Sequence, residues 1–206
     1  MRSRVLISLA VFVLPLALPA CAPTVRQPGA DSAATDARTR TSPRAEFWDA
    51  LHALCGRAFS GRVVEAPAGD TTFAGRALVM HVRECGDTLR IPFHVGADRS
   101  RTWVFTRTAD GIRLKHDHRH EDGTEDAVTQ YGGDTQAVGT AERQEFPADA
   151  FTAGLIPAAA TNVWTVEVHP GRSFVYALRR EGTDRRYRIE FDLTRPVPPP
   201  PAPWGF

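Results

Sequence analysis

The chain has 206 residues, 42% of them hydrophobic, and 25 basic against 24 acidic side chains give it a formal net charge of +1. A near-neutral chain with both signs mixed lacks the electrostatic footprint of a nucleic-acid-binding protein, so we expect no nucleic-acid partner. The length suits one domain of moderate size with a core of its own.

The first twenty residues are organised as a secretory signal peptide. Arg2 and Arg4 give a positive beginning, an apolar run covers residues 5–18, and the small residue Ala20 precedes the expected cleavage site. The apolar run is shorter than the ~20 residues that cross a bilayer as a helix. We therefore predict that residues 1–20 are removed from the mature protein.

The residues at that site, Leu-Pro-Ala-Cys at 18–21, resemble the lipobox of bacterial lipoproteins. The resemblance implies that Cys21 becomes the first residue and carries acyl chains, which would make a membrane the partner of the mature chain. Ala22, rather than Asp, at the second mature position resembles the choice that directs lipoproteins to the outer membrane of Gram-negative bacteria. The expected location is therefore the cell envelope, with a lipid anchor at the outer membrane.

Composition divides the rest of the chain into three parts. Residues 21–42 have almost no apolar content and are expected to be a disordered tether. Residues 196–206 form a Pro-rich tail, with six prolines between 196 and 203, and polyproline II is expected there. Residues 43–195 between them are expected to form one domain.

An N-terminal helix opens this domain. Ser42 can cap it, Pro43 fits its first turn and Gly56 can end it, while Phe47 and Leu51 share one apolar face. After Gly56 the hydrophobic period changes from 3.6 to 2, which indicates strands.

Two cysteines remain once Cys21 is set aside. Cys55 and Cys85 are an even pair in an oxidising compartment, and the chain has no Cys-x-x-Cys spacing that would indicate a redox site. We predict a structural disulfide between them.

Short alternating segments separated by turn residues fill the domain as far as residue 193. They favour an all-β fold, an antiparallel barrel of 8–10 strands with one N-terminal helix, over the alternative of a β-sandwich or jelly roll. After the strand beginning near Phe59, the expected ranges are 73–84, 88–95, 102–108, 112–120, 127–131, 138–146, 162–169, 173–180 and 185–193.

Two resemblances bear on this fold. Gly56-x-x-Phe59-x-Gly61 is similar to the Gly-x-Trp start of the calycins, the lipocalin and nitrobindin type of barrel, and implies such an architecture without any functional residue. The stretch HDHRHEDG at 116–123 resembles that of a family of secreted bacterial proteins whose function is not known, and it implies no activity.

The densest group of ligand-type side chains lies in the segment 112–120. If this segment is one strand, His116, His118 and His120 continue the inward face of Ile112 and Leu114. These histidines would then line the barrel interior. They are candidate ligand-pocket residues, together with the aromatic residues Tyr131 and Trp103.

A metal site is the alternative interpretation of the same segment. His118-x-His120 followed by Glu125 is similar to the first metal motif of the cupins, with one extra residue, and the second cupin motif is absent. The resemblance implies a divalent ion held by His118, His120 and Glu125. A buried or rim network in which Asp or Tyr side chains satisfy the neutral histidines without a metal is the favoured explanation of the segment.

No residue set for catalysis can be assembled from the motifs of this chain. It has no nucleophile motif, no Gly-rich phosphate loop and no recognisable carboxylate pair. The expected function is therefore non-enzymatic binding of a small apolar or amphipathic ligand inside the barrel. A metal-binding protein and an accessory envelope protein without a ligand are the alternatives.

Overall fold

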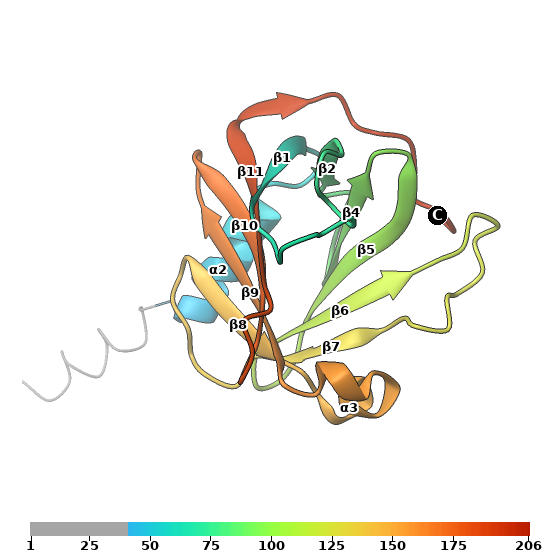
Figure 1. Cartoon of the computed structure of the whole chain (residues 1–206). Coiled ribbons are helices and arrows are strands. Elements are labelled where there is room, and N and C mark those ends of the chain that lie inside the picture. The colour runs from blue at the N-terminus through green and yellow to red at the C-terminus, as the bar shows by residue number, and fades with distance from the viewer. Residues whose placement is uncertain (1–40) are drawn as a thin grey trace, which may run out of the picture. The chain divides into compact units, whose positions relative to one another are not determined.

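The computed structural model describes residues 41–206 and shows a nearly closed antiparallel β-barrel (Figure 1). Ten strands follow one another in the order β7-β6-β5-β4-β2-β1-β11-β10-β9-β8, and the short β3 pairs with β4. The strands are β1 (Ala58–Glu65), β2 (Leu78–His81), β3 (Glu84–Cys85), β4 (Thr88–Val95), β5 (Asp98–Arg107), β6 (Ile112–His118), β7 (Tyr131–Asp134), β8 (Arg143–Pro147), β9 (Asn162–His169), β10 (Ser173–Arg180) and β11 (Arg186–Val197). The predicted all-β barrel with an N-terminal helix is confirmed.

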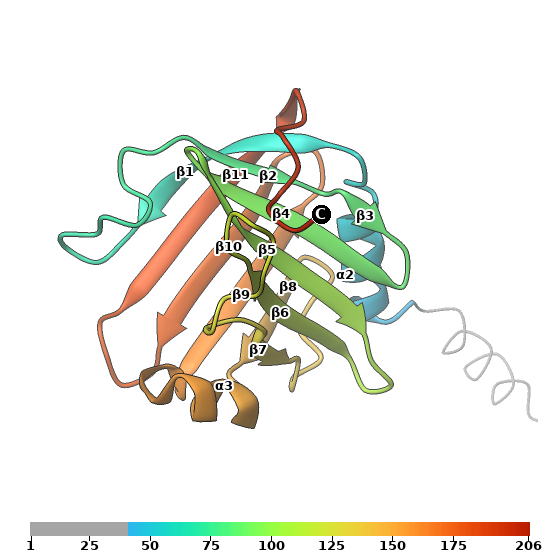
Figure 2. The ribbon, with the colours of Figure 1, turned by 90° about the vertical axis from the view of Figure 1, so that its right-hand side faces the viewer.

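Helix α2 (Pro43–His52) lies at one end of the barrel, and α3 (Ala150–Leu155) lies toward the other (Figure 2). The Ser42 side chain accepts a hydrogen bond from the Ala45 N–H, so the predicted cap is present. Phe47 and Leu51 of α2 are fully buried in the core. Arg107, the last residue of β5, lies over the Trp48 ring at 4.9 Å, which places α2 at the end of the barrel where β5 finishes.

The seam between β7 and β8 is closed by a side chain instead of a strand ladder. The Thr152 hydroxyl of α3 donates to the Gly132 carbonyl at 2.8 Å and accepts from the Gly132 N–H at 2.7 Å. The Asp149 N–H also donates to the Gly132 carbonyl, at 2.9 Å. A Cβ on Gly133 would lie 1.8 Å from the Pro147 carbonyl oxygen, so only glycine permits this close approach.

Aromatic side chains fill the middle of the barrel. Trp103 stacks on Phe93 with ring centroids 4.8 Å apart and on Tyr176 at 4.5 Å. These contacts join β4 and β5 to β10 across the interior, because alternate residues of every strand point inward. Rings of this size supply much of the apolar area buried on folding.

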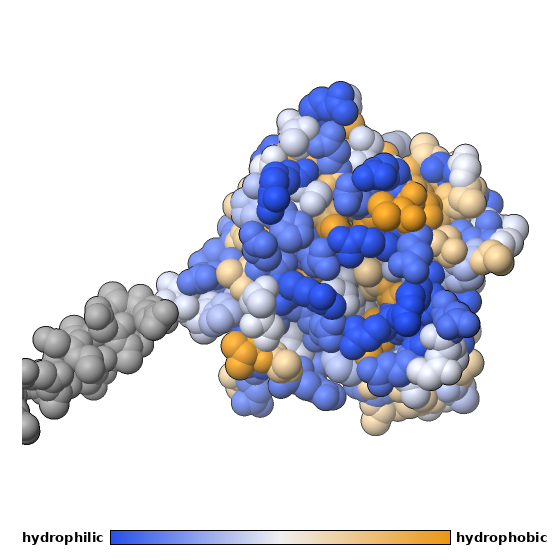
Figure 3. All heavy atoms as spheres, turned by 60° about the vertical axis from the view of Figure 1, so that its left-hand side comes forward, coloured by the Kyte–Doolittle hydropathy of each residue, from blue (hydrophilic) through white to orange (hydrophobic). Residues whose placement is uncertain are grey.

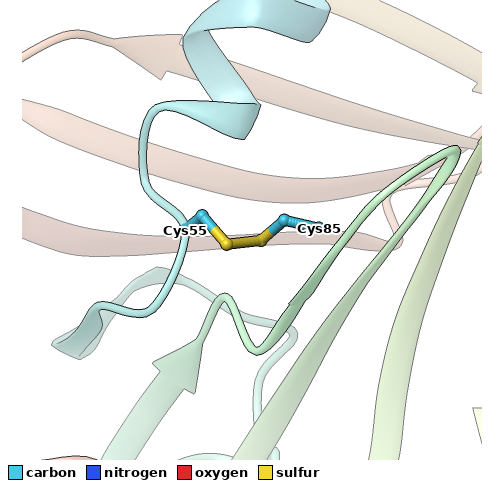
Figure 4. The surroundings of a disulfide bond; sticks show 2 residues. All are labelled: Cys55 and Cys85. Carbon is cyan, nitrogen blue, oxygen red and sulfur yellow. A yellow bond between two sulfur atoms is a disulfide. The ribbon is translucent and has the colours of Figure 1, made fainter.

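The predicted disulfide is confirmed. Cys55 follows α2 and Cys85 ends β3, and their bond ties the helix to the β3–β4 hairpin (Figure 4). It joins positions 30 residues apart in the sequence.

The outer face is polar. Hydrophilic residues dominate the side of the molecule shown in Figure 3, with small apolar patches between them. On the outside of the barrel, Arg179 of β10 holds Glu145 of β8 with two hydrogen bonds of 2.8 and 3.0 Å. Arg188 of β11 holds Glu167 of β9 at 2.9 Å. No helix within residues 41–206 is long and apolar enough to cross a membrane.

The C-terminal tail lies against the outside of the barrel. The Trp204 N–H donates to the Arg99 carbonyl at 3.1 Å, and Arg99 Nη1 donates to the Ala202 carbonyl at 3.0 Å. The Phe206 ring lies 5.2 Å from the guanidinium of Arg90 and 5.5 Å from that of Arg119. Strand β11 continues as far as Val197, so the first two residues of the predicted tail belong to the sheet.

Several predicted ranges were wrong at their ends. The range 73–84 begins too early, because the Asp70 carboxylate accepts the N–H groups of Thr72 and Phe73 and holds that segment in a turn before β2. The range 112–120 ends too late: β6 stops at His118, and the Gly123 N–H donates to the His120 carbonyl in a turn. The range 127–131 shares only its last residue with β7 (Tyr131–Asp134), and 138–146 begins before β8 (Arg143–Pro147). The range 102–108 begins too late, because β5 starts at Asp98. Helix α3 was not predicted.

The predicted signal peptide, Cys21 and nearly all of the predicted tether lie outside the described residues.

Candidate functional site

A cavity of about 300 Å³ lies at the end of the barrel opposite α2. Its wall takes residues from the start of β5, the end of β6 and the start of β7, and from the facing ends of β9, β10 and β11. The loop before β2 and the segment after α3 complete it. A smaller space of about 50 Å³ continues deeper, toward Trp103 and His116. The main lining residues are Phe73, Arg101, His118, Tyr131, Ile156, Ala159, Asn162, Trp164, Tyr176, Leu178, Arg180, Arg185 and Tyr187.

His116 forms the floor of this site and is fixed at both ring nitrogens. Nδ1 lies 3.0 Å from the Tyr131 carbonyl and Nε2 lies 2.8 Å from the Tyr176 hydroxyl. Because a carbonyl only accepts, Nδ1 carries the proton and Nε2 accepts from the tyrosine hydroxyl. Burial lowers the pKa of His116 to about 3, so the ring is neutral at neutral pH. Both hydrogen-bonding positions of this imidazole are therefore used within the protein.

His118 lies two residues further along the same inward face and lines the main cavity. Its Nε2 is hydrogen-bonded to the Tyr131 hydroxyl at 2.9 Å. Burial lowers the pKa of His118 to about 4, and the positive charge of Arg101 on the neighbouring strand acts in the same direction. Burial raises the pKa of Tyr131 to about 12. The histidine and tyrosine side chains of the site are thus uncharged at neutral pH.

Aromatic rings form the sides of the site. The Tyr131 ring stacks on His116 at 4.6 Å and is tilted against Trp164 at 5.8 Å. Phe73, from the loop before β2, meets Tyr187 edge to face at 5.5 Å. The Tyr187 hydroxyl donates to Asp70 at 3.0 Å, which fastens that loop over the cavity. The arrangement is an apolar, ring-lined wall with polar groups at a few fixed points, as in pockets for small organic molecules.

Three arginines stand at the mouth. Arg101 forms an ion pair with Asp98 and lies opposite His118 in the β5–β6 register. Arg180 Nε donates to the Asn162 side-chain oxygen at 2.9 Å. The Arg185 guanidinium lies over the Tyr187 ring at 5.2 Å.

The structure places the other predicted site residues in different ways. Trp103 lines the deep extension of the cavity beside His116. His120 is exposed, beyond the end of β6, and lines neither of these spaces. Glu125 is also exposed and holds Arg119 at 3.1 Å.

The structure does not bring together a set of metal ligands. His118 points into the barrel, whereas His120 and Glu125 lie in the exposed segment after β6. Within residues 41–206, no group of three or more His, Cys, Asp or Glu side chains is arranged to hold an ion. The three residues that the cupin resemblance suggests as ligands of a divalent ion, His118, His120 and Glu125, therefore do not meet in one place.

Sequence reasoning missed the contribution of β9, β10 and β11. Trp164, Tyr176, Arg180 and Arg185 are absent from the predicted site residues. A signal was present in the alternation, because Arg180 ends the inward series Phe174, Tyr176 and Leu178. A cation at the end of an apolar face indicates a strand end that opens to water.

No protein-family model, no curated protein and no solved structure matches this chain.

Proposed function

We propose that this protein binds a small organic molecule in the cavity opposite α2 without transforming it, while held at the cell envelope by lipid on Cys21. The observation that carries the binding proposal is the 300 Å³ cavity whose sides are rings and whose wall carries a few polar groups. Binding pockets for small molecules have volumes of about 300 to 1,000 Å³ and this mixture of surfaces.

The state of the histidines favours binding over catalysis. A general acid or base works best when its pKa lies near the working pH. The pKa values of His116 and His118, about 3 and 4, and that of Tyr131, about 12, are all far from 7. His116 also has both nitrogens engaged by protein partners. The uncharged side chains of His118 and Tyr131, which line the cavity, therefore suit contact with a ligand better than proton transfer to it.

Filling the cavity tests the binding proposal. Leu178 lines the wall, and Leu178→Trp would occupy part of the space. Val138 is 58% exposed and lines no part of the cavity, so Val138→Trp is the matched control. Small naphthalene derivatives are titrated into the full chain while tryptophan fluorescence is followed. Saturable binding to the parent and the control, weakened at least tenfold in Leu178→Trp, is expected; equal binding to all three proteins would contradict the proposed site.

The anchoring proposal has its own test. The lipobox-like residues at 18–21 support it, and the expected mature chain begins at a lipidated Cys21. Mass spectrometry of the membrane fraction should find acyl chains on an N-terminal Cys21 peptide, and Cys21→Ser should abolish them. Recovery of the unsubstituted chain in the soluble fraction with an unmodified Cys21 would contradict the anchor.

A further inference from the structure

The three arginines at the mouth share one structural position. Arg101 and Arg180 belong to the inward-facing series of their strands, Arg185 lies in the connection just before β11, and all three stand at the same end of the barrel. Arg101 precedes Trp103 on β5, Arg180 follows Leu178 on β10, and Arg185 precedes Tyr187 of β11 by two residues. Because side chains alternate along a strand, Arg101 and Arg180 point to the same side as the rings that line the cavity. All three line it.

Their partners distinguish two of them from the arginines on the outside of the same strands. Arg179 and Arg188 face outward and are paired with Glu145 and Glu167. Within residues 41–206, neither Arg180 nor Arg185 has a carboxylate within 4.0 Å, and only Arg101 of the three is neutralised by an acid, Asp98.

The surrounding acids leave Arg180 and Arg185 without an ion pair. No Asp or Glu is among the lining residues. Asp98 is paired with Arg101 and accepts from the Ser100 N–H. The Asp70 carboxylate accepts from the neutral Tyr187 hydroxyl, and the charge of Asp126 acts on His118, but within residues 41–206 neither acid lies within 4.0 Å of Arg180 or Arg185. Burial lowers the pKa of His118 to about 4, so this histidine contributes no charge at neutral pH. The mouth therefore carries two guanidinium groups without an ion-pair partner, and each can hold an anionic group of a ligand.

The shape of the interior narrows the ligand class. Trp164, Tyr176 and Tyr131 present rings to the cavity, and its volume of about 300 Å³ is at the low end for ligand pockets. Rings prefer flat partners in offset or edge contacts. Guanidinium groups bind carboxylates with two parallel hydrogen bonds, which fixes the orientation of the acid group.

We infer that the ligand is a small organic anion with a flat, aromatic or conjugated body and a carboxylate that Arg180 and Arg185 hold at the mouth. This inference rests on the proposed binding function and adds its chemical class. The body enters between the rings of Trp164 and Tyr176, and the acid group stays at the water-facing end.

Three probes that share a naphthalene ring test the anionic ligand class separately from the proposed binding of a small molecule. The full chain is titrated calorimetrically with naphthalene-2-carboxylate, with naphthalene-2-carboxamide and with 2-(aminomethyl)naphthalene. The carboxylate should bind at least tenfold more tightly than the amide and the amine should bind least, because hydrogen bonds to charged groups are the strong ones. Added salt should weaken only the carboxylate's binding appreciably.

The arginine variants locate the effect. The double variant Arg180→Gln, Arg185→Gln should weaken carboxylate binding about tenfold or more and leave amide binding unchanged. Arg186→Gln is the matched control, since Arg186 is an exposed neighbour that does not line the cavity. It should behave as the parent does.

Failure of the anionic ligand class and failure of the binding function would give different results. Equal binding of acid and amide, lost in Leu178→Trp, would overturn the anionic ligand class and leave the binding function in place. Binding of none of the three probes would count against the binding function itself.

Discussion

Replacing the buried His116 by phenylalanine should flatten the acid side of the stability profile. The imidazole has a pKa near 6.5 in an unfolded chain and of about 3 in this fold, where burial disfavours its charged form. The folded-state pKa is the lower of the two, so the neutral ring stabilises the fold fully above pH 6.5. That stability is lost as the pH falls from 6.5 toward 3, because His116 is protonated in the unfolded chain over this range and stays neutral in the folded one.

The expected magnitude follows from proton linkage. Each histidine of this kind lowers the free energy of unfolding by about 1.4 kcal/mol per pH unit within its window. Between pH 6.5 and pH 4.5 the share of His116 is therefore roughly 3 kcal/mol. His118, with a pKa of about 4, contributes in the same direction, and burial also lowers the pKa values of His81 and His94. The parent slope is the sum of these shares, and the variant should lose one of them.

Urea unfolding of the oxidised full chain, followed by far-ultraviolet circular dichroism from pH 7.5 to pH 4.5, measures this slope. His116→Phe should be less stable than the parent at pH 7.5, because the Tyr176 hydroxyl and the Tyr131 carbonyl lose their partner. Its stability should nevertheless fall less steeply. Val138→Phe changes an exposed residue that carries no titratable group and should follow the parent slope. An unchanged slope in His116→Phe would refute a neutral, desolvated His116.

Three further predictions concern stability. Replacing Cys55 and Cys85 together by alanine removes a link between positions 30 residues apart and should lower the free energy of unfolding by about 3–4 kcal/mol. Calorimetry should then show a melting temperature lower by roughly 10 °C. An unchanged melting temperature would show that the bond does not constrain the unfolded chain. Thr152→Val leaves the Gly132 N–H without its acceptor, while the Gly132 carbonyl keeps the Asp149 N–H, and should cost about 1–3 kcal/mol in urea unfolding. Thr152→Ser should retain most of that stability. Ser42→Ala removes the cap of α2 and should cost about 1 kcal/mol, with the loss reversed in Ser42→Asp.

The barrel was predictable because period two is a local property of each strand. The ranges 88–95, 162–169 and 173–180 match β4, β9 and β10 to the residue, and each is bounded by turn residues. Boundaries failed where side chains compete with the ladder. The Asp70 carboxylate takes backbone N–H groups that would otherwise extend β2, and such capping looks in sequence like any other aspartate near a strand. Helix α3 had only the Asp149 cap as a signal, over six residues.

Strand alternation also predicts the histidines of the site, whereas it does not predict the arginines at the mouth. His116 and His118 continue the inward face of one strand, so alternation alone predicts that they point into the barrel. Arg180 at the end of β10 and Arg185 just before β11 are remote in sequence from β6 and meet its end only once the barrel curves round. Which strand ends meet depends on strand order and register, and period two does not determine either one. The exposed position of His120 depended on where β6 stops.

The seam at Thr152 gives this barrel a property that continuously laddered barrels lack. Its circumference is held at one point by a hydroxyl and an amide on Gly132, next to the strand that carries Tyr131. Breaking a few bonds there would separate β7 from β8 without disturbing any other strand pair, so local opening is least costly on the ligand side of the molecule. The wall of the barrel is therefore weakest at this seam. In hydrogen exchange, the Gly132 and Asp149 amides should exchange well before those of β10. Separation of β7 from β8 at this seam would widen the cavity for a larger molecule, while the other strand pairs stay intact.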